Sequence, residues 1–275
     1  MITKRIFQLT VPSSDDGQKF IRTDRLDLIM GILTDSDYEI FGDMLLAKVY
    51  RHQDFHANAP NMLVSCHIDS LYSENFASLK DAELQGTFDN SVCNAVLVEA
   101  MINSLLPAQV LVSFTGDEEH ASKGAVQTIE LLQKEGVFDS LEMVIVLDIT
   151  EEGYRLCHHT IENYFVEKGN TQSILQFRKK RHLKQYLKTF VDSPVTIKNG
   201  DEDEAWLYDE YDLNCFSLCL PCRLLGDDMH DDAGVAILRK ALKKYSHALQ
   251  QFTQEINKDL ATKIIEKVGK KLWPR

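Results

Sequence analysis

Residues 143–150 read MVIVLDIT, so an unbroken apolar run, 143–147, is followed at once by Asp148. A fully apolar run of this length is typical of a strand that is buried on both faces. A carboxylate directly after such a strand needs a partner, because burying a lone charge is costly. The stretch therefore predicts a covered sheet and marks Asp148 as a candidate functional residue.

Short β-rich runs and helical patterns alternate on both sides of this strand. Further strands are expected at 62–66, 109–115 and 215–220, and helices at 91–105, 121–135, 173–190 and 234–252. The first 60 residues indicate a helix followed by β-rich structure. This alternation is typical of a largely parallel sheet covered on both faces by helices. Because no internal repeat or long flexible linker interrupts the pattern, we expect residues 1–275 to form one α/β domain.

The composition, 44% hydrophobic and 26% charged, is typical of a soluble globular protein. No apolar run approaches the ~18 residues of a membrane span, and the first ten residues, MITKRIFQLT, lack the apolar stretch of a signal peptide. We therefore expect a cytoplasmic protein with six free cysteine thiols and no membrane contact. The net charge of −12 argues against nucleic acid as a partner.

Metal-competent side chains follow the predicted strands. Ligands of open α/β sheets bind beyond the carboxyl ends of the strands, so residues placed there are expected to share one rim. The residues so placed, or just before a helix, are His67, Asp89, Glu118, Glu119, Asp148 and His230. Asp69 projects to the same side of an extended segment as His67 and is suited to orient the imidazole.

Each of these residues also has a structural interpretation. Asp89 alone is commonly a helix N-cap, and Glu118 and Glu119 alone are acids that the helix dipole favours in a first turn. A lone His67 or His230 at a strand end is more often structural than functional. Coincidence at every position on one edge is improbable, so the set as a whole favours a functional site.

The motifs H-x-D (67–69), G-x-x-D-N (86–90) and E-E-x-x-x-x-G-A (118–125), with Asp148 and a late His230, resemble those of the co-catalytic dinuclear zinc peptidase clan. The resemblance runs from about residue 62 to 234. The D-N pair favours the aminopeptidase branches, and VLDIT looks like the glutamyl and tetrahedral aminopeptidases. Asp89 follows His67 by only 22 positions, too few for the lid of those enzymes, so the chain is most similar to compact bacterial leucyl-type aminopeptidases.

The resemblance implies a three-layer α/β fold with a mostly parallel sheet, helices on both faces and no lid insertion. It also implies two divalent metal ions, with Asp89 bridging. One metal is expected on His67, Asp148 and Asp89, and the other on Glu119, His230 and Asp89. Glu118 is implied as the general base and Asp69 as the residue that orients His67. Imidazole and carboxylate ligands suit Zn²⁺, and also Co²⁺ or Mn²⁺.

The implied activity is hydrolysis of N-terminal residues from peptides by a metal-bridged water that Glu118 activates. Three alternatives stay open. The CHIDS stretch (66–70) also looks like the first motif of glutaminyl cyclases, which use one zinc ion. Hydrolysis of N-acyl amino acids uses the same scaffold. A non-catalytic descendant that binds metal or a partner is the third. The preferred peptide, the native metal and the oligomeric state stay open as well.

Some features depart from the family pattern or carry no motif. Ala121 stands where the family often has glycine. Asp231 and Asp232 follow His230, and they either bind a substrate amine or are simply solvated. The stretch 149–223 is the expected place of a specificity pocket. The pair at 158–159, both histidines, is a weak candidate for substrate contact, and the run DEDE (201–204) predicts the start of a solvated helix.

Overall fold

The computed structural model describes the backbone of residues 1–22, 24–156, 160–165, 196–197 and 203–272. Side chains are described in these ranges except at 156, 160–165, 196–197 and 259–272. The helix expected at 173–190 and the histidine pair at 158–159 therefore lie outside the described residues. Among the described residues, none of the helices combines the length and the apolar character that crossing a membrane requires.

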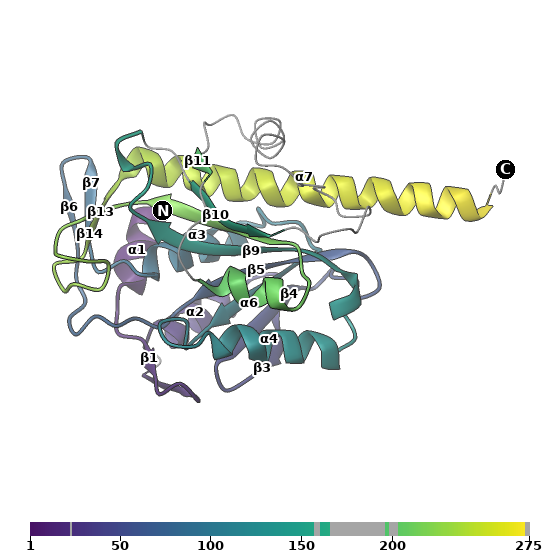
Figure 1. Ribbon diagram of the computed structural model, residues 1–275, viewed down its shortest axis with the longest axis horizontal. Helices are drawn as coiled ribbons and strands as arrows, with labels where there is room; N and C mark the ends of the chain where they lie inside the picture. The colour runs from purple at the N-terminus through teal and green to yellow at the C-terminus, as the bar shows by residue number, and fades with distance from the viewer. Residues whose placement is uncertain (23, 157–159, 166–195, 198–202, 273–275) are drawn as a thin grey trace.

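The main sheet has eight strands, and its centre is parallel (Figure 1). In spatial order the strands are β11 (Thr196–Ile197), β10 (Thr160–Phe165), β12 (Cys215–Pro221), β9 (Leu141–Thr150), β5 (Asn61–His67), β8 (Val110–Thr115), β4 (Ala47–His52) and β3 (Tyr38–Asp43). Strands β12, β9, β5 and β8 are mutually parallel. β10 pairs antiparallel with β12, and β4 pairs antiparallel with both β8 and β3. The expected strands at 62–66, 109–115, 143–147 and 215–220 are confirmed.

The strand register brings the predicted site residues to one edge. His67, the last residue of β5, is level with Thr115, the last residue of β8. Asp148 lies in β9 opposite Cys219 of β12, two residues before β9 ends. Parallel strands all present their carboxyl ends at the same edge, which is where the chain leaves the sheet toward functional loops.

Helices cover both faces of this sheet, which confirms the three-layer α/β class. One face is covered by α1 (Ile2–Leu9), α2 (Asp24–Leu33), α3 (Ser91–Ile102) and α7 (Arg239–Leu272), and the other by α4 (Lys123–Lys134) and α6 (Glu204–Glu210). The apolar residues of each layer form one buried cluster per face. In α3 eleven of twelve residues are buried, because this helix lies between the sheet and the neighbouring helices.

A second, smaller sheet lies at one end of the molecule (Figure 1). Its order is β13 (Arg223–Leu224), β14 (Val235–Leu238), β7 (Glu83–Gly86) and β6 (Ala77–Lys80). The remaining elements are the hairpin of β1 (Ser14–Asp15) and β2 (Phe20–Arg22) and the 3-10 helices η1 (Phe138–Ser140) and η2 (Tyr154–Leu156).

Two sequence predictions need correction. The helix expected from residue 234 begins at Arg239, because Val235–Leu238 pairs with β7 as a strand and a local apolar pattern cannot distinguish the two. The DEDE run does begin a helix, α6, with Asp203 as N-cap accepting from the N–H of Ala205 (2.7 Å). The helix start is not solvated, however, since Glu204 is 0% exposed.

Candidate metal centre

His67 has a fixed position at the carboxyl edge of the sheet. The residue is buried, and Asn94 of α3 donates from Nδ2 to the His67 carbonyl oxygen (2.7 Å). Arg25 of α2 donates from Nη1 to the carbonyl oxygen of Ile68 (2.9 Å). These two bonds hold the backbone where β5 ends, so the imidazole is positioned by both helices.

Three carboxylates surround this imidazole. Nε2 of His67 lies 3.2 Å from Oδ1 of Asp89 and 3.6 Å from Oδ1 of Asp148, and Nδ1 lies 3.4 Å from Oδ1 of Asp69. The loop that carries Asp89 is tied to β9, because Asn90 donates from Nδ2 to a carbonyl oxygen of that strand (2.7 Å). The peptide bond between Asp89 and Asn90 is cis.

Glu118 and Glu119 lie in the turn that follows β8. Asp117, the residue before them, has a φ of +62°, and its N–H donates to Oδ2 of Asp15 (2.7 Å). The N–H of Glu119 donates to Oδ2 of Asp69 (3.3 Å). The turn is therefore held from the N-terminal hairpin on one side and from the H-x-D segment on the other.

Gly124, the glycine of the E-E-x-x-x-x-G-A motif, has a packing role. A Cβ atom at this position would lie 2.5 Å from the carbonyl oxygens of both Gly116 and Leu46. Only glycine lets α4 begin this close to the backbone of the turn.

His230 reaches the cluster from the loop between β13 and β14. Its Nδ1 lies 3.4 Å from Oε2 of Glu119, and 42% of its side chain is exposed. Asp231 accepts hydrogen bonds from two N–H groups of the same loop, and Asp232 accepts from the N–H of Ser73 (2.8 Å). Both acids thus hold the loop that carries His230, a structural role that the sequence did not indicate, and amine recognition by them stays a prediction.

The structure brings all seven predicted side chains together. Ligand atoms lie within 4.8 Å of one another in three groups: His67 with Asp89 and Asp148, Asp89 with Glu119 and His230, and His67 with Glu118 and Glu119. Asp89 belongs to the first two groups. Those two groups have the composition of the two ligand sets that the motif resemblance implies.

Mutual repulsion and burial dominate the electrostatics of the cluster. Burial raises the pKa of Glu118 well above its usual value and that of Glu119 to about 9, and neighbouring carboxylates add to both shifts. Burial lowers the pKa of His67, but the charge of Glu118 and the nearby aspartates outweigh it and hold that pKa well above 6.5. Without a cation, therefore, the cluster retains protons, and a divalent cation would replace them.

Several buried polar atoms of the cluster have no hydrogen-bond partner. They are Nδ1 and Nε2 of His67, Oδ1 of Asp69, Oδ1 of Asp89 and Oε1 of Glu119. Buried groups are rarely left unpaired, because each costs roughly 1–3 kcal/mol. Imidazole nitrogens and carboxylate oxygens that converge without partners are suited to coordinate divalent metal ions, so the residues fit the implied group.

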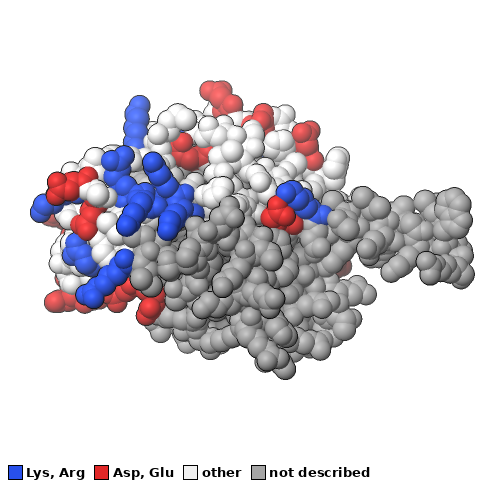
Figure 2. Space-filling model, turned by 90° about the horizontal axis from the view of Figure 1, so that it is seen from above, with Lys and Arg blue, Asp and Glu red and all other residues white. Residues whose placement is uncertain are grey.

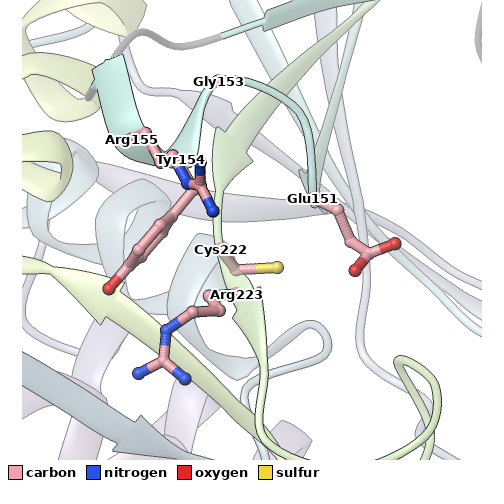
Figure 3. A pocket seen from close by; sticks show the side chains of 6 residues that line it. All are labelled: Glu151, Gly153, Tyr154, Arg155, Cys222 and Arg223. Atoms are coloured by element: carbon pink, nitrogen blue, oxygen red, sulfur yellow. The ribbon is translucent and has the colours of Figure 1, made fainter.

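A pocket of about 480 Å³ is formed by the segments that follow β9 and β12 (Figure 3). Its described lining consists of Glu151, Gly153, Tyr154, Arg155, Cys222 and Arg223. These residues fall within 149–223, the stretch in which a specificity pocket is expected. Sequence reasoning did not single out either arginine, because isolated basic residues carry no spacing signal.

Two further buried charges were missed by sequence reasoning. Arg25 is 0% exposed and donates to the carbonyl oxygens of Leu9 (3.1 Å), Val11 (3.3 Å) and Ile68 (2.9 Å). Glu204 accepts from Oγ of Ser65 (2.7 Å), two residues before His67 in β5. Their sequence contexts are those of ordinary surface charges, so no signal could have found them.

No protein-family model and no curated relative matches the sequence. Solved structures do match along nearly the whole chain. The TET1 peptidase of Pyrococcus horikoshii has a TM-score of 0.66 at 12% identity, covering 92% of this chain and 99% of that one. The aminopeptidase PepT of Bacillus cereus has a TM-score of 0.64 at 11% identity, covering 93% and 98%.

Aminopeptidase APDkam598 of the archaeon Desulfurococcus kamchatkensis has a TM-score of 0.62 at 14% identity, covering 92% of this chain and 94% of that one. Identities this low establish the fold and not the activity. The resemblance drawn from the motifs is thus matched by a likeness in three dimensions, and the chain has the fold of these peptidases.

Proposed function

We propose that this protein is a metal-dependent aminopeptidase that removes N-terminal residues from peptides. The observation that carries the proposal is the position of Asp89, which lies within ligand distance of two groups, one with His67 and Asp148 and the other with Glu119 and His230. A carboxylate shared in this way would hold two cations close enough for both to act on one water. The peptidase names of the structural neighbours support the same reaction.

Different residues carry the separate steps of the reaction. When bound, the metals supply a water of lowered pKa and polarise the scissile carbonyl. Glu118 takes the proton from the attacking water at a carboxylate oxygen and then delivers it to the leaving amine. Its location in the cluster, in one group with His67 and Glu119, suits both steps, since the same carboxylate must accept the proton and then donate it. Asp69 holds the imidazole of His67 from its Nδ1 side, which directs Nε2 toward Asp89 and Asp148.

The test is metal content together with a substrate screen. The protein is saturated with Zn²⁺, desalted and analysed by elemental mass spectrometry, and aminoacyl anilides and short peptides are then assayed. We expect two metals per chain, release of the N-terminal residue, and loss of activity with a chelator. One metal per chain with cyclisation of N-terminal glutamine would contradict the proposal, and so would metal-loaded protein that hydrolyses no N-terminal residue.

We also propose that the native metal is Zn²⁺ and that the protein acts in the cytoplasm. The ligand types support the first proposal, because two histidines and three carboxylates match the donor set of zinc hydrolases. Metal analysis of protein purified without added metal tests it, and fractionation of the source cells tests the second.

A further inference from the structure

The pocket formed after β9 and β12 lies beside the candidate metal centre. The N–H of Cys222 donates to the carbonyl oxygen of Thr150 (2.7 Å), so the chain leaves β9 and β12 side by side at this edge. Glu151 follows Asp148 by three residues. On the other side, Sγ of Cys222 lies 3.7 Å from Sδ of Met229, the residue that directly precedes His230.

The two sides of the pocket carry opposite charge. Glu151 lies on one side, and Arg155 and Arg223 lie on the other with Tyr154 between them (Figure 3). A substrate that carries an ammonium group and a carboxylate therefore finds a partner for each. Glu151 is closer in sequence to the candidate metal ligand Asp148 than Arg155 is. This position suits Glu151 to recognise an N-terminal ammonium close to the reacting bond.

The two arginines differ in how they are held. The guanidinium of Arg223 lies 3.2 Å from Glu83 and 5.7 Å from the centre of the Tyr154 ring, and 46% of its side chain is exposed. Arg155 is exposed and forms no ion pair with any residue whose side chain is described. Arg223 is thus oriented by its neighbours, whereas Arg155 has its charge available for a ligand. A guanidinium binds a carboxylate through two parallel hydrogen bonds.

The surface around the pocket is also basic, although the chain has a net charge of −12. Figure 2 shows Lys and Arg side chains gathered at one end of the upper face. The exposed basic residues of the small sheet and of the start of α7 are Lys80, Arg223, Arg239, Lys240 and Lys243. Asp and Glu side chains lie among them in Figure 2, so the positive charge is local, and it attracts anionic ligands to the part of the surface that carries Arg223.

We propose that the pocket binds a carboxylate of the substrate, with Arg155 as the principal partner and Arg223 as the second. This inference rests on the proposed aminopeptidase function and assigns its substrate class. The carboxylate has two sources, the side chain of an acidic N-terminal residue or the C-terminus of a dipeptide. Both place a negative group at a short distance from the N-terminal ammonium that Glu151 would bind.

Paired substrates distinguish the two sources. Metal-loaded protein is assayed with glutamyl and glutaminyl anilides, and with Ala-Ala and Ala-Ala amide. We expect kcat/KM to favour the carboxylate by about 10- to 100-fold in one pair, the range of a hydrogen-bonded charge. A preference for the glutamyl over the glutaminyl anilide shows that the pocket binds the side-chain carboxylate. A preference for Ala-Ala over Ala-Ala amide shows that it binds the C-terminal carboxylate. The proposal is overturned if neither pair shows a preference.

Substitutions locate the effect. Arg155→Gln is expected to remove most of the preference, and Arg155→Glu to reverse it toward a lysyl anilide. Lys134→Gln, which removes a charge that is 77% exposed at the end of α4, outside the pocket and outside the basic surface around it, is the control and should keep the preference. A preference that survives both Arg155 substitutions would overturn the assignment.

Binding separates this inference from the proposed function. If no compound is hydrolysed, calorimetric titration of the same four compounds shows whether the carboxylate is still recognised. Selective binding without hydrolysis would refute the aminopeptidase function and retain the carboxylate pocket. Efficient hydrolysis with no discrimination within either pair would support the aminopeptidase function and refute the carboxylate pocket.

Discussion

Nε2 of His67 lies 3.2 Å from Oδ1 of Asp89, and both atoms are buried without a well-formed hydrogen bond. Asp89 is also within ligand distance of Glu119 and His230. One carboxylate therefore connects a side chain that ends β5 with a loop that enters from the small sheet. This connection defines the candidate site, and substitutions can test its parts separately.

Glu118→Gln is expected to retain two metals per chain and to lose catalysis. A general base contributes about 10²–10⁴-fold, so kcat should fall by at least about 10²-fold. Steady-state assays together with elemental analysis of the same sample check this. Glu130→Gln, an exposed carboxylate on α4, is the control and should behave as the wild type. Undiminished kcat in Glu118→Gln would remove this residue from the mechanism.

Asp89→Asn is expected to lower metal content below two per chain, because it weakens the carboxylate shared by both ligand groups. The readout is metal retained after desalting, with circular dichroism to confirm that the chain is folded. Asp54→Asn is the matched control, since 83% of the Asp54 side chain is exposed. If Asp89→Asn keeps both metals, the bridging assignment is wrong.

Glu204→Gln is expected to change how stability depends on pH in metal-free protein. Burial raises the pKa of Glu204 to about 7 from an ordinary 4.5. Its contribution to stability is therefore fully present below pH 4.5 and is lost as pH rises through 7. The loss amounts to about 3 kcal/mol at 1.36 kcal/mol per pKa unit.

Urea denaturation between pH 5 and 8, in the presence of a chelator, checks this prediction. The free energy of unfolding of the wild type should fall relative to that of Glu204→Gln as pH rises. The amide can still accept the hydrogen bond from Ser65 (2.7 Å in the wild type). Parallel curves for the two proteins would show that Glu204 does not titrate in this range.

Arg25→Met is expected to destabilise the fold by more than about 2 kcal/mol. The substitution leaves the carbonyl oxygens of Leu9, Val11 and Ile68 without this donor, and a buried unpaired acceptor costs roughly 1–3 kcal/mol. Equilibrium unfolding in urea measures the difference. Arg22→Met removes an arginine whose side chain is 57% exposed, and it should change stability by under about 0.5 kcal/mol. Equal effects of the two substitutions would contradict the role of Arg25.

Local pattern predicted much of the fold. The apolar runs of β5, β8, β9 and β12 are recognisable because strands buried on both faces leave an uninterrupted apolar signal. The helix expected at 121–135 is confirmed as α4, and Gly136 follows its C-cap with a φ of +69° that glycine adopts without strain. The strand β14 was mistaken for the start of a helix, since four apolar residues fit either period and its partner β7 lies about 150 residues earlier in the sequence.

The sequence by itself determined the order of the motifs and the residue types at the strand ends. Both are local properties, because a buried strand and the residue that follows it are recognised from neighbouring positions alone. It therefore predicted the seven residues that the structure brings together. Only the tertiary structure decided which distant charges share one environment. Arg25, Glu204, Arg155 and Arg223 look like surface residues in their local context, and burial or a shared pocket becomes visible only once segments far apart in sequence are packed together.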